Sequence, residues 1–356
     1  MIRFVRTLLA LLPPLLAAAG GFSAAQETRD SGLVEKVEVA RLLVEARVLD
    51  AQGRAVEGLG PADFRVFVDG EPADLISAEW TTGALEEGEA LAARVVEPAK
   101  PGAPVAAPAP AAGRLIVLFF QRRISIARDA GPLRMTHYAA RFVEQLEPND
   151  LVALVSHDSR LNVHFDFTKD HAAIARELRE RILSFDRPPD FPAPQAEPSL
   201  AAHLDARAAA ESATPEAALE ALAKGLAGVP GSKTMVFLGW GLGRQTADGV
   251  TTNGEFTAAR RALIRSRTTV TALDITDTDW QSLEAPMRSM AADTGGAFAK
   301  TNDFPLAAVR RAAATISGHY LLQIRKPARP RGSHSLEVAL VKPRGRTVLT
   351  RGFYED

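Results

Sequence analysis

The chain of 356 residues contains no cysteine. This absence excludes disulfide bonds, and it also excludes a lipid anchor attached to a cysteine at a cleavage site. The formal net charge is only −1. Because nucleic-acid-binding domains are usually strongly basic, we expect no nucleic-acid partner. Beyond the N-terminus the sequence has no apolar run long enough to cross a bilayer as a helix, so we expect no stable membrane insertion.

The first 25 residues have the pattern of a secretory signal peptide. Arg3 and Arg6 precede an apolar segment, and small residues end it at Ser23-Ala24-Ala25. An uncleaved membrane anchor is the alternative, but the apolar run from Leu8 to Ala19 is too short to span a bilayer. We therefore predict a signal peptide at residues 1–25 and an exported bacterial protein that is periplasmic or extracellular.

The two ends of the remaining chain have β patterns. Residues 35–80 contain an alternating strand in "EKVEVARLLVEARVLD" and a hairpin in "DFRVFVDGEP", whose Asp69-Gly70 pair is a two-residue turn signal. Residues 319–356 again contain only strands. Each set alone has a thin core. We predict that both pack together as one small β domain; the alternative is two separate β appendages.

Between these ends the pattern changes twice. Residues 81–113 are rich in proline and alanine and are typical of an extended linker. From 114 to 318 strands and helices alternate, which predicts a mostly parallel sheet with helices on both faces. One predicted helix covers 132–146 and places Leu133 on its apolar face. Residues 185–213 are predicted to be a low-complexity insertion at the surface.

Four stretches carry a resemblance to a known family. They are "VEARVLDAQGRAVEGLGPADFRVFVDGEP", "LIVLFF", "DLVALVSHDSRLNVHFDFTKD" and the C-terminal "HYLLQIRKP…LEVALVKPRGRTVLTRGFYED". Together they resemble the von Willebrand factor A-related proteins of acidobacterial type. The resemblance implies a Rossmann-like α/β domain at 114–318, with strands 319–356 packing against 35–80.

Domains of this family often hold a divalent cation at the C-terminal edge of the sheet. The family's ligands are an Asp-x-Ser-x-Ser stretch after the first strand, a threonine and a second aspartate, which together suit Mg²⁺. Laid on this chain, the first stretch falls on Phe120, Arg122 and Ile124, and the second aspartate falls on Trp240. Thr214 matches the threonine but is equally a helix N-cap. The resemblance therefore implies a lost metal-ion-dependent adhesion site, with no metal and no cofactor.

The residues that replace these ligands suggest a face for a protein partner. Arginine and tryptophan are enriched at interface hot spots, and an arginine pair can bind a carboxylate directly. The alternative is that the aromatic side chains are core and the arginines are merely solvated. An acidic run in "LDITDTDW" can bind Ca²⁺ or a basic partner, or else solvate a loop and cap a helix near Trp280. The candidate partner-binding face consists of Gln121, Arg122, Arg123, Trp240, Arg244, Asp274 and Asp277.

Other motifs do not support catalysis. "GWGLGR" has arginine at the third glycine position, and loop residues follow where a phosphate-binding helix is needed. "GSKT" at 231–234 precedes a strand, whereas a P-loop follows one. In "SHDS" neighbouring side chains point to opposite faces of a strand and cannot form a relay. His157 and His164 lie on different strands and can meet, but two histidines are too few for a metal site.

We therefore predict an exported, non-catalytic protein-interaction module, with a partner in the cell envelope whose identity is unknown. No catalytic residues are assigned. A cell-envelope hydrolase on the same fold is one alternative, and a structural scaffold that assembles through its β domain is another.

Overall fold

The structure is a computed structural model that describes residues 41–82, 113–122, 130–184, 191–276 and 283–355. Within these residues a six-stranded sheet has the order β12-β11-β8-β5-β6-β7. Neighbouring strands are parallel, except that β7 runs antiparallel to β6 at the edge. Counted from β7, this is the 3-2-1-4-5-6 order of doubly wound α/β proteins. The strands are β5 (Leu115–Gln121), β6 (Leu151–His157), β7 (Leu161–Thr168), β8 (Lys233–Gly239), β11 (Thr268–Asp274) and β12 (Phe298–Lys300).

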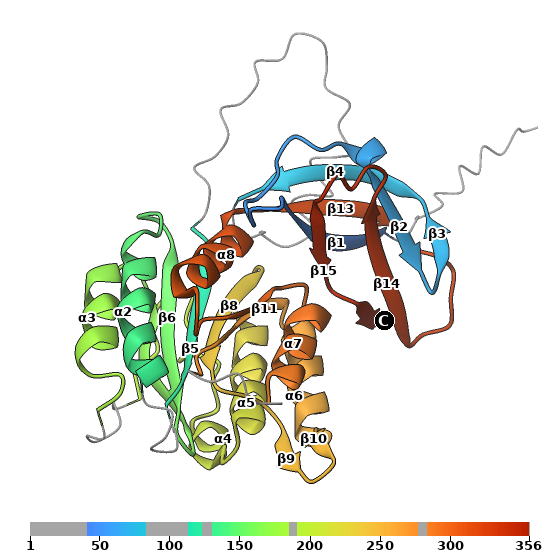
Figure 1. The fold of residues 1–356 in the computed structure, drawn as a ribbon. Helices are drawn as coiled ribbons and strands as arrows, with labels where there is room; N and C mark the ends of the chain where they lie inside the picture. The colour runs from blue at the N-terminus through green and yellow to red at the C-terminus, as the bar shows by residue number, and fades with distance from the viewer. Residues whose placement is uncertain (1–40, 83–112, 123–129, 185–190, 277–282, 356) are drawn as a thin grey trace, which may run out of the picture. The chain divides into compact units, whose positions relative to one another are not determined.

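Helices cover both faces of this sheet (Figure 1). Side chains such as Val117 and Phe119 pack under one set of helices, and their neighbours Ile116 and Leu118 pack under the other set. Strands buried on both faces explain the continuous apolar run of β5. The first face carries α4 (Ala206–Glu211), α5 (Pro215–Gly228), α6 (Gly254–Arg265) and α7 (Glu284–Asp293). The second face carries α2 (Ala130–Glu144), α3 (His171–Glu180) and α8 (Pro305–Ser317).

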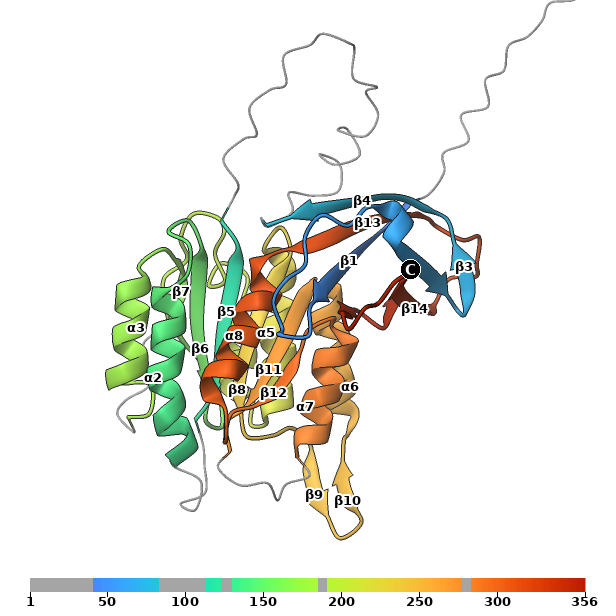
Figure 2. The same ribbon diagram turned by 45° about the horizontal axis from the view of Figure 1, so that its top comes forward.

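The two ends of the described chain form two antiparallel sheets that share one apolar core (Figure 2). Their orders are β15-β1-β13-β4 and β16-β14-β2-β3. N-terminal and C-terminal strands alternate in the first sheet, and in the second the C-terminal pair joins the N-terminal pair through β14 and β2. Tyr320 on β13 is fully buried in this core and packs against Phe64 and Trp80. The strands are β1 (Arg41–Leu49), β2 (Phe64–Val68), β3 (Glu71–Ala73), β4 (Leu75–Thr81), β13 (His319–Arg325), β14 (Ser333–Leu340), β15 (Thr347–Thr350) and β16 (Phe353–Glu355), with a 3-10 turn, η1, at Pro61–Asp63.

The predicted fold class is confirmed in both of its parts. The α/β part has a mostly parallel sheet with helices on both faces, and the β part combines strands from the two ends of the chain. The structure also shows Thr214 as an N-cap, because its side chain accepts a hydrogen bond of 3.1 Å from the backbone N–H of Ala217. The boundaries at 35–80, 114–318 and 319–356 stay a prediction, since Val39–Asp356 form a single compact unit.

Three local expectations need correction. Leu133, predicted on the apolar face of its helix, is exposed, because it shares the solvent-facing side of α2 with His137 and Arg141, four and eight residues further on. Residues 244–251, expected to be loop, contain a small hairpin of β9 (Arg244–Thr246) and β10 (Gly249–Thr251). Within 185–213, residues 199–211 are not uniformly superficial: Leu200, Leu204 and Ala209 enter the core, whereas residues 202–203 and 205–207 are exposed.

Two predicted segments lie outside the described residues, namely the signal peptide at 1–25 and nearly all of the linker at 81–113. Both stay predictions. Among the described helices, none combines the length and the apolar character that a membrane span requires.

Candidate functional site

The C-terminal ends of β5 and β8 lie side by side at the edge of the sheet where von Willebrand factor A domains often hold a cation. Gln121, the last residue of β5, accepts a hydrogen bond of 2.9 Å from the Trp240 backbone N–H. Its amide nitrogen also donates to the Gly241 carbonyl at 3.2 Å. The structure thus brings Gln121 and Trp240 together as expected. The Gln121 side chain is buried, however, and holds the loop after β8 instead of facing a partner.

The arginines of the predicted face do not form one exposed cluster. The Arg122 guanidinium is buried, with Nη1 at 3.2 Å from Asp158 Oδ2 and Nη2 donating to the Ser184 carbonyl. Arg244 is exposed, but it lies on the β9–β10 hairpin. Arg123 falls outside the described residues. Arg122 therefore ties the end of β5 to its neighbours and is not free to bind a carboxylate from outside.

The residues at the expected metal positions do not fit a divalent cation. Phe120 is fully buried in the core, and Trp240 offers an indole ring, so neither supplies the hard oxygen ligands that Mg²⁺ requires. Thr214 caps α5, and its hydroxyl donates to Glu255 Oε2 at 2.9 Å. In the part of the chain that the structure describes, no group of three or more His, Asp or Glu side chains could hold a metal ion.

Asp274 ends β11 at the same edge but is engaged locally. Its Oδ1 accepts hydrogen bonds from the backbone N–H of Thr276 at 3.0 Å and from the Thr276 hydroxyl at 2.8 Å. Burial raises the pKa of this carboxyl above its usual range. Asp277 and the adjoining residues to 282 lie outside the described chain. Asp274 therefore closes its own turn, and a role in binding a partner stays a prediction.

The two motifs that resemble phosphate-binding loops, "GWGLGR" and "GSKT", make contacts within the chain. In "GWGLGR" the Gly243 backbone N–H donates to the Glu216 carboxylate, which occupies the place a phosphate would need. In "GSKT" the Lys233 ammonium donates to the Val229 carbonyl at 2.7 Å. Burial lowers the pKa of Lys233 to about 8. The Gly243 amide and the Lys233 ammonium are therefore engaged within the chain.

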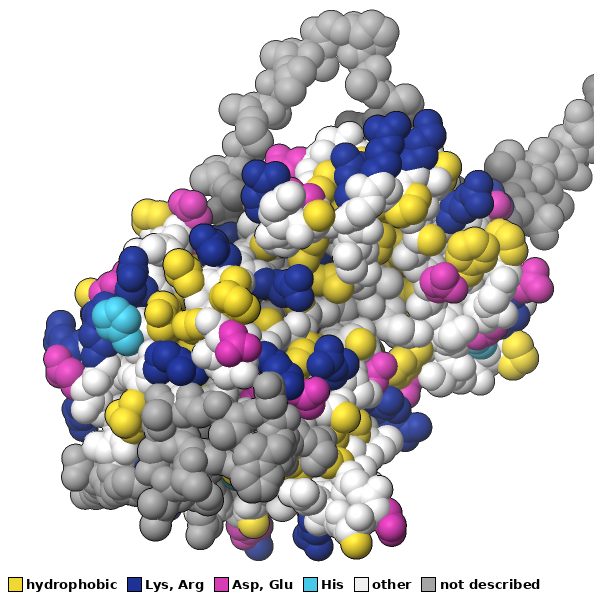
Figure 3. Space-filling view, in the orientation of Figure 1, with side chains coloured by type: hydrophobic (Ala, Val, Ile, Leu, Met, Phe, Trp, Pro, Cys, Tyr) yellow, Lys and Arg dark blue, Asp and Glu magenta, His cyan; other side chains and the backbone are white. Residues whose placement is uncertain are grey.

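Sequence reasoning missed an apolar group at this same edge. Leu133 is 62% exposed on the first turn of α2, and Phe304 and Leu306, at the start of α8, are 73% and 48% exposed. Both helices follow parallel strands, so they begin at the C-terminal edge of the sheet. Arg134 on α2 contacts the segment that precedes α8, because its Nη2 donates to the Thr301 carbonyl at 3.3 Å. Figure 3 shows apolar side chains gathered over the face formed by α8 and α2. We call Leu133, Phe304 and Leu306 the rim patch.

A second unexpected arrangement joins β6, β7 and α3. Ser156 Oγ lies 2.8 Å from His164 Nε2, and His164 Nδ1 lies 2.9 Å from Glu177 Oε1. The hydrogen bond with His164 is the main cause that lowers the pKa of Glu177. This is the order of contacts in a serine–histidine–carboxylate relay, but Ser156 is 0% exposed beneath α3. Without access for a substrate, the three side chains hold α3 against the sheet. His157 does not meet His164 and instead contacts the Ser212 carbonyl.

The burial of Ser156 predicts that a fluorophosphonate probe will not label the folded protein. The probe must reach the serine oxygen, and this oxygen is enclosed between the sheet and α3. Labelling is measured by intact mass, with Ser156→Ala as the matched control. An adduct that forms on the wild type and is lost in Ser156→Ala would instead identify this relay as a hydrolase site.

Comparisons with known proteins add similarities of fold only. No protein-family model and no curated protein matches the chain. An aerotolerance-related membrane protein from Bacteroides fragilis is 13% identical over 58% of this chain and 98% of its own, with a TM-score of 0.36. BatB from Bacteroides thetaiotaomicron is 13% identical over 57% and 97%, with a TM-score of 0.36. A von Willebrand factor type A protein from Catenulispora acidiphila is 11% identical over 83% and 75%, with a TM-score of 0.42. Similarities of this size do not identify a function.

Proposed function

We propose that this chain is an exported, non-catalytic protein-interaction module of the cell envelope, similar to von Willebrand factor A-related proteins of acidobacterial type. In this proposal the metal-ion-dependent adhesion site is lost, and a protein partner docks on the rim patch at the C-terminal edge of the sheet. The single observation that carries the proposal is the exposure of Leu133, Phe304 and Leu306 at this edge.

The chemistry of the edge supports an apolar partner surface instead of a metal-bridged carboxylate. Phe120 and Trp240, at the positions of the family's two aspartates, supply no oxygen ligand. Gln121 and Arg122 make hydrogen bonds and an ion pair within the chain. Large apolar side chains that stay exposed near one another are typical of protein interaction sites. Trp240 lies at the same edge and is partly exposed. The proposed partner therefore offers apolar side chains, and its binding requires no cation.

Replacing the rim patch by polar residues is expected to abolish partner capture without affecting folding. In Leu133→Ser with Phe304→Ser and Leu306→Ser the removed side chains face solvent, so the melting temperature should change little. Crosslinking of the tagged protein in its own cells, followed by mass spectrometry, should show that at least one partner crosslinked to wild type is reduced about tenfold or more in the variant, because hot-spot truncations cost about 1.4 kcal/mol or more.

The matched control changes exposed apolar residues of the β domain. Ile76 and Val341 are each 40% exposed, and Ile76→Ser with Val341→Ser should leave capture unchanged. Adding EDTA should also leave capture unchanged, because the proposal requires no cation. The same partner list for wild type and the rim variant would reject the rim patch, whereas loss of capture in EDTA would reject the lost metal site.

A further inference from the structure

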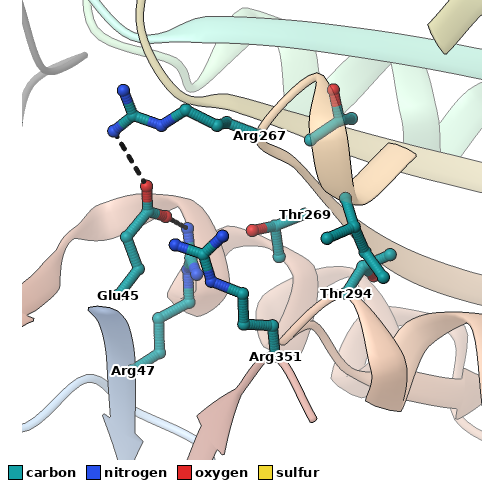
Figure 4. A pocket seen from close by; sticks show the side chains of 8 residues that line it. Glu45, Arg47, Arg267, Thr269, Thr294 and Arg351 are labelled. Carbon is teal, nitrogen blue, oxygen red and sulfur yellow. Dashed lines mark hydrogen bonds and ion pairs between the residues drawn. The ribbon is translucent and has the colours of Figure 1, made fainter. Parts of the chain in front are cut away.

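A small cavity lies at the opposite edge of the parallel sheet from the rim patch (Figure 4). It is formed by β1, the segment before β16, the start of β11 and the end of α7. Its volume is about 20 Å³. Glu45 and Arg47 reach it from β1, Arg267 comes from the turn before β11, and Arg351 follows β15. The remaining lining residues are Ile264, Thr268, Thr269 and Thr294.

The charges around this cavity do not balance. Glu45 is its only carboxylate among the lining residues, and it faces three guanidiniums. Arg47 Nη2 lies 3.4 Å from Glu45 Oε2, and Arg267 Nη2 lies 3.6 Å from Glu45 Oε1. Arg351 has no ion pair within the described residues, and its Nη2 donates only to the Leu43 carbonyl at 3.0 Å. Burial lowers the pKa of Arg351, but an arginine does not lose its proton in a protein.

Two further ionisable groups near the cavity, His319 and Lys233, do not supply a second negative charge. Burial lowers the pKa of His319 to about 4, so this ring is neutral at pH 7. Lys233 adds positive charge, since its pKa is lowered only to about 8. Burial would raise the pKa of Glu45, but the charge that His319 carries in acid, the charges of the arginines and the Ser232 hydroxyl outweigh it and hold the pKa well below its usual range. The lining of the cavity therefore has one ionised carboxylate, Glu45, and three positively charged guanidiniums.

We propose that this cavity binds a chloride ion, held by the guanidiniums of Arg351, Arg47 and Arg267 and by the Thr269 hydroxyl. The volume has room for one small ion. A neutral water would leave the excess positive charge in a site of low dielectric, whereas a small monovalent anion reduces it. The ion joins β1 and β15 to the turn before β11 and so stabilises the folded chain.

Chloride is tested by thermal unfolding of the purified mature protein in sodium chloride and in sodium gluconate at equal ionic strength. Gluconate is much larger than chloride and is the reference anion, so replacing it by about 150 mM chloride should raise the melting temperature by about 3 °C. Bromide should act like chloride and should give an anomalous scattering peak beside Arg351 in crystals. Equal melting temperatures in the two salts, or a bromide-soaked crystal without that peak, would overturn the proposal.

Thr269→Val tests whether the chloride-dependent rise in melting temperature comes from this cavity. The substitution keeps the shape of the side chain and removes the hydroxyl, so the chloride-dependent shift should fall to half or less. The matched control is Thr246→Val, an exposed threonine on β9, which should keep the full shift. A full chloride shift in Thr269→Val would place the ion elsewhere and would reject this cavity as its site.

Discussion

Glu45→Ala is expected to lower the free energy of unfolding by about 3–5 kcal/mol, because removing one partner from a buried ion pair leaves an uncompensated charge. The Glu45 side chain is only 12% exposed, and it is the carboxylate that Arg47 and Arg267 share. It also accepts a hydrogen bond from Ser232. The loss is measured by urea unfolding at pH 7.

Two comparisons separate the charge of Glu45 from its packing. Glu45→Gln keeps the shape and removes the charge, so it should cost most of what alanine costs. Glu79→Ala, on the exposed part of β4 in the same sheet, should change stability by about 0.5 kcal/mol or less. If Glu45→Gln were as stable as wild type, the buried arginines would not depend on this carboxylate for their charge balance.

The direction of the pH dependence follows from the lowered pKa of Glu45. A carboxyl whose pKa is lower in the folded state than in the unfolded state contributes stability above its unfolded value of about 4.5. That contribution is lost as the pH falls toward the folded value. The difference between wild type and Glu45→Ala should therefore be largest near pH 7 and should shrink in acid.

The Glu45 cluster also shows where sequence reasoning ends. The strands themselves were predictable, because Phe64, Val66 and Val68 share one face by period-two spacing and Asp69-Gly70 is a strong turn signal. Nothing local to Glu45 indicates that Arg351, about 300 positions away, shares its cavity. Pairing of β1 with β15 brings them together, and this register depends on the whole fold.

The candidate site divides in the same way. That β5 and β8 end side by side follows from the alternating strand and helix pattern, and Gln121 and Trp240 are indeed neighbours. This pattern does not predict which of the side chains at this edge are buried and which are exposed. Arginine side chains are usually exposed, yet the Arg122 guanidinium is buried and contacts the Asp158 carboxylate and the Ser184 carbonyl. Conversely, Leu133 was assigned to the apolar face of its helix, but it lies on the solvent-facing side of α2 with His137 and Arg141.

The segment after the proline-rich stretch is held by a single buried carboxylate, which the composition of the sequence does not reveal. Asp166 on β7 is buried, and its two oxygens accept four hydrogen bonds. Oδ1 accepts from the backbone N–H of Phe167 at 2.7 Å and of Leu200 at 2.6 Å. Oδ2 accepts from the Ser199 hydroxyl at 2.6 Å and from the Ala201 N–H at 3.1 Å. Leu200 is thereby fixed in the core, although proline-rich residues precede it.

Asp166→Asn is accordingly expected to destabilise the protein by about 2–4 kcal/mol, because an amide nitrogen replaces one of the accepting oxygens and faces N–H or O–H donors. The segment 199–201 should open with it, so limited proteolysis should cut near Leu200 in the variant and spare the wild type. Asp248→Asn, in the exposed turn between β9 and β10, is the matched control and should leave stability and proteolysis unchanged. An Asp166→Asn protein as stable and as resistant as wild type would mean that packing of Leu200 and Leu204 holds this segment without the carboxylate.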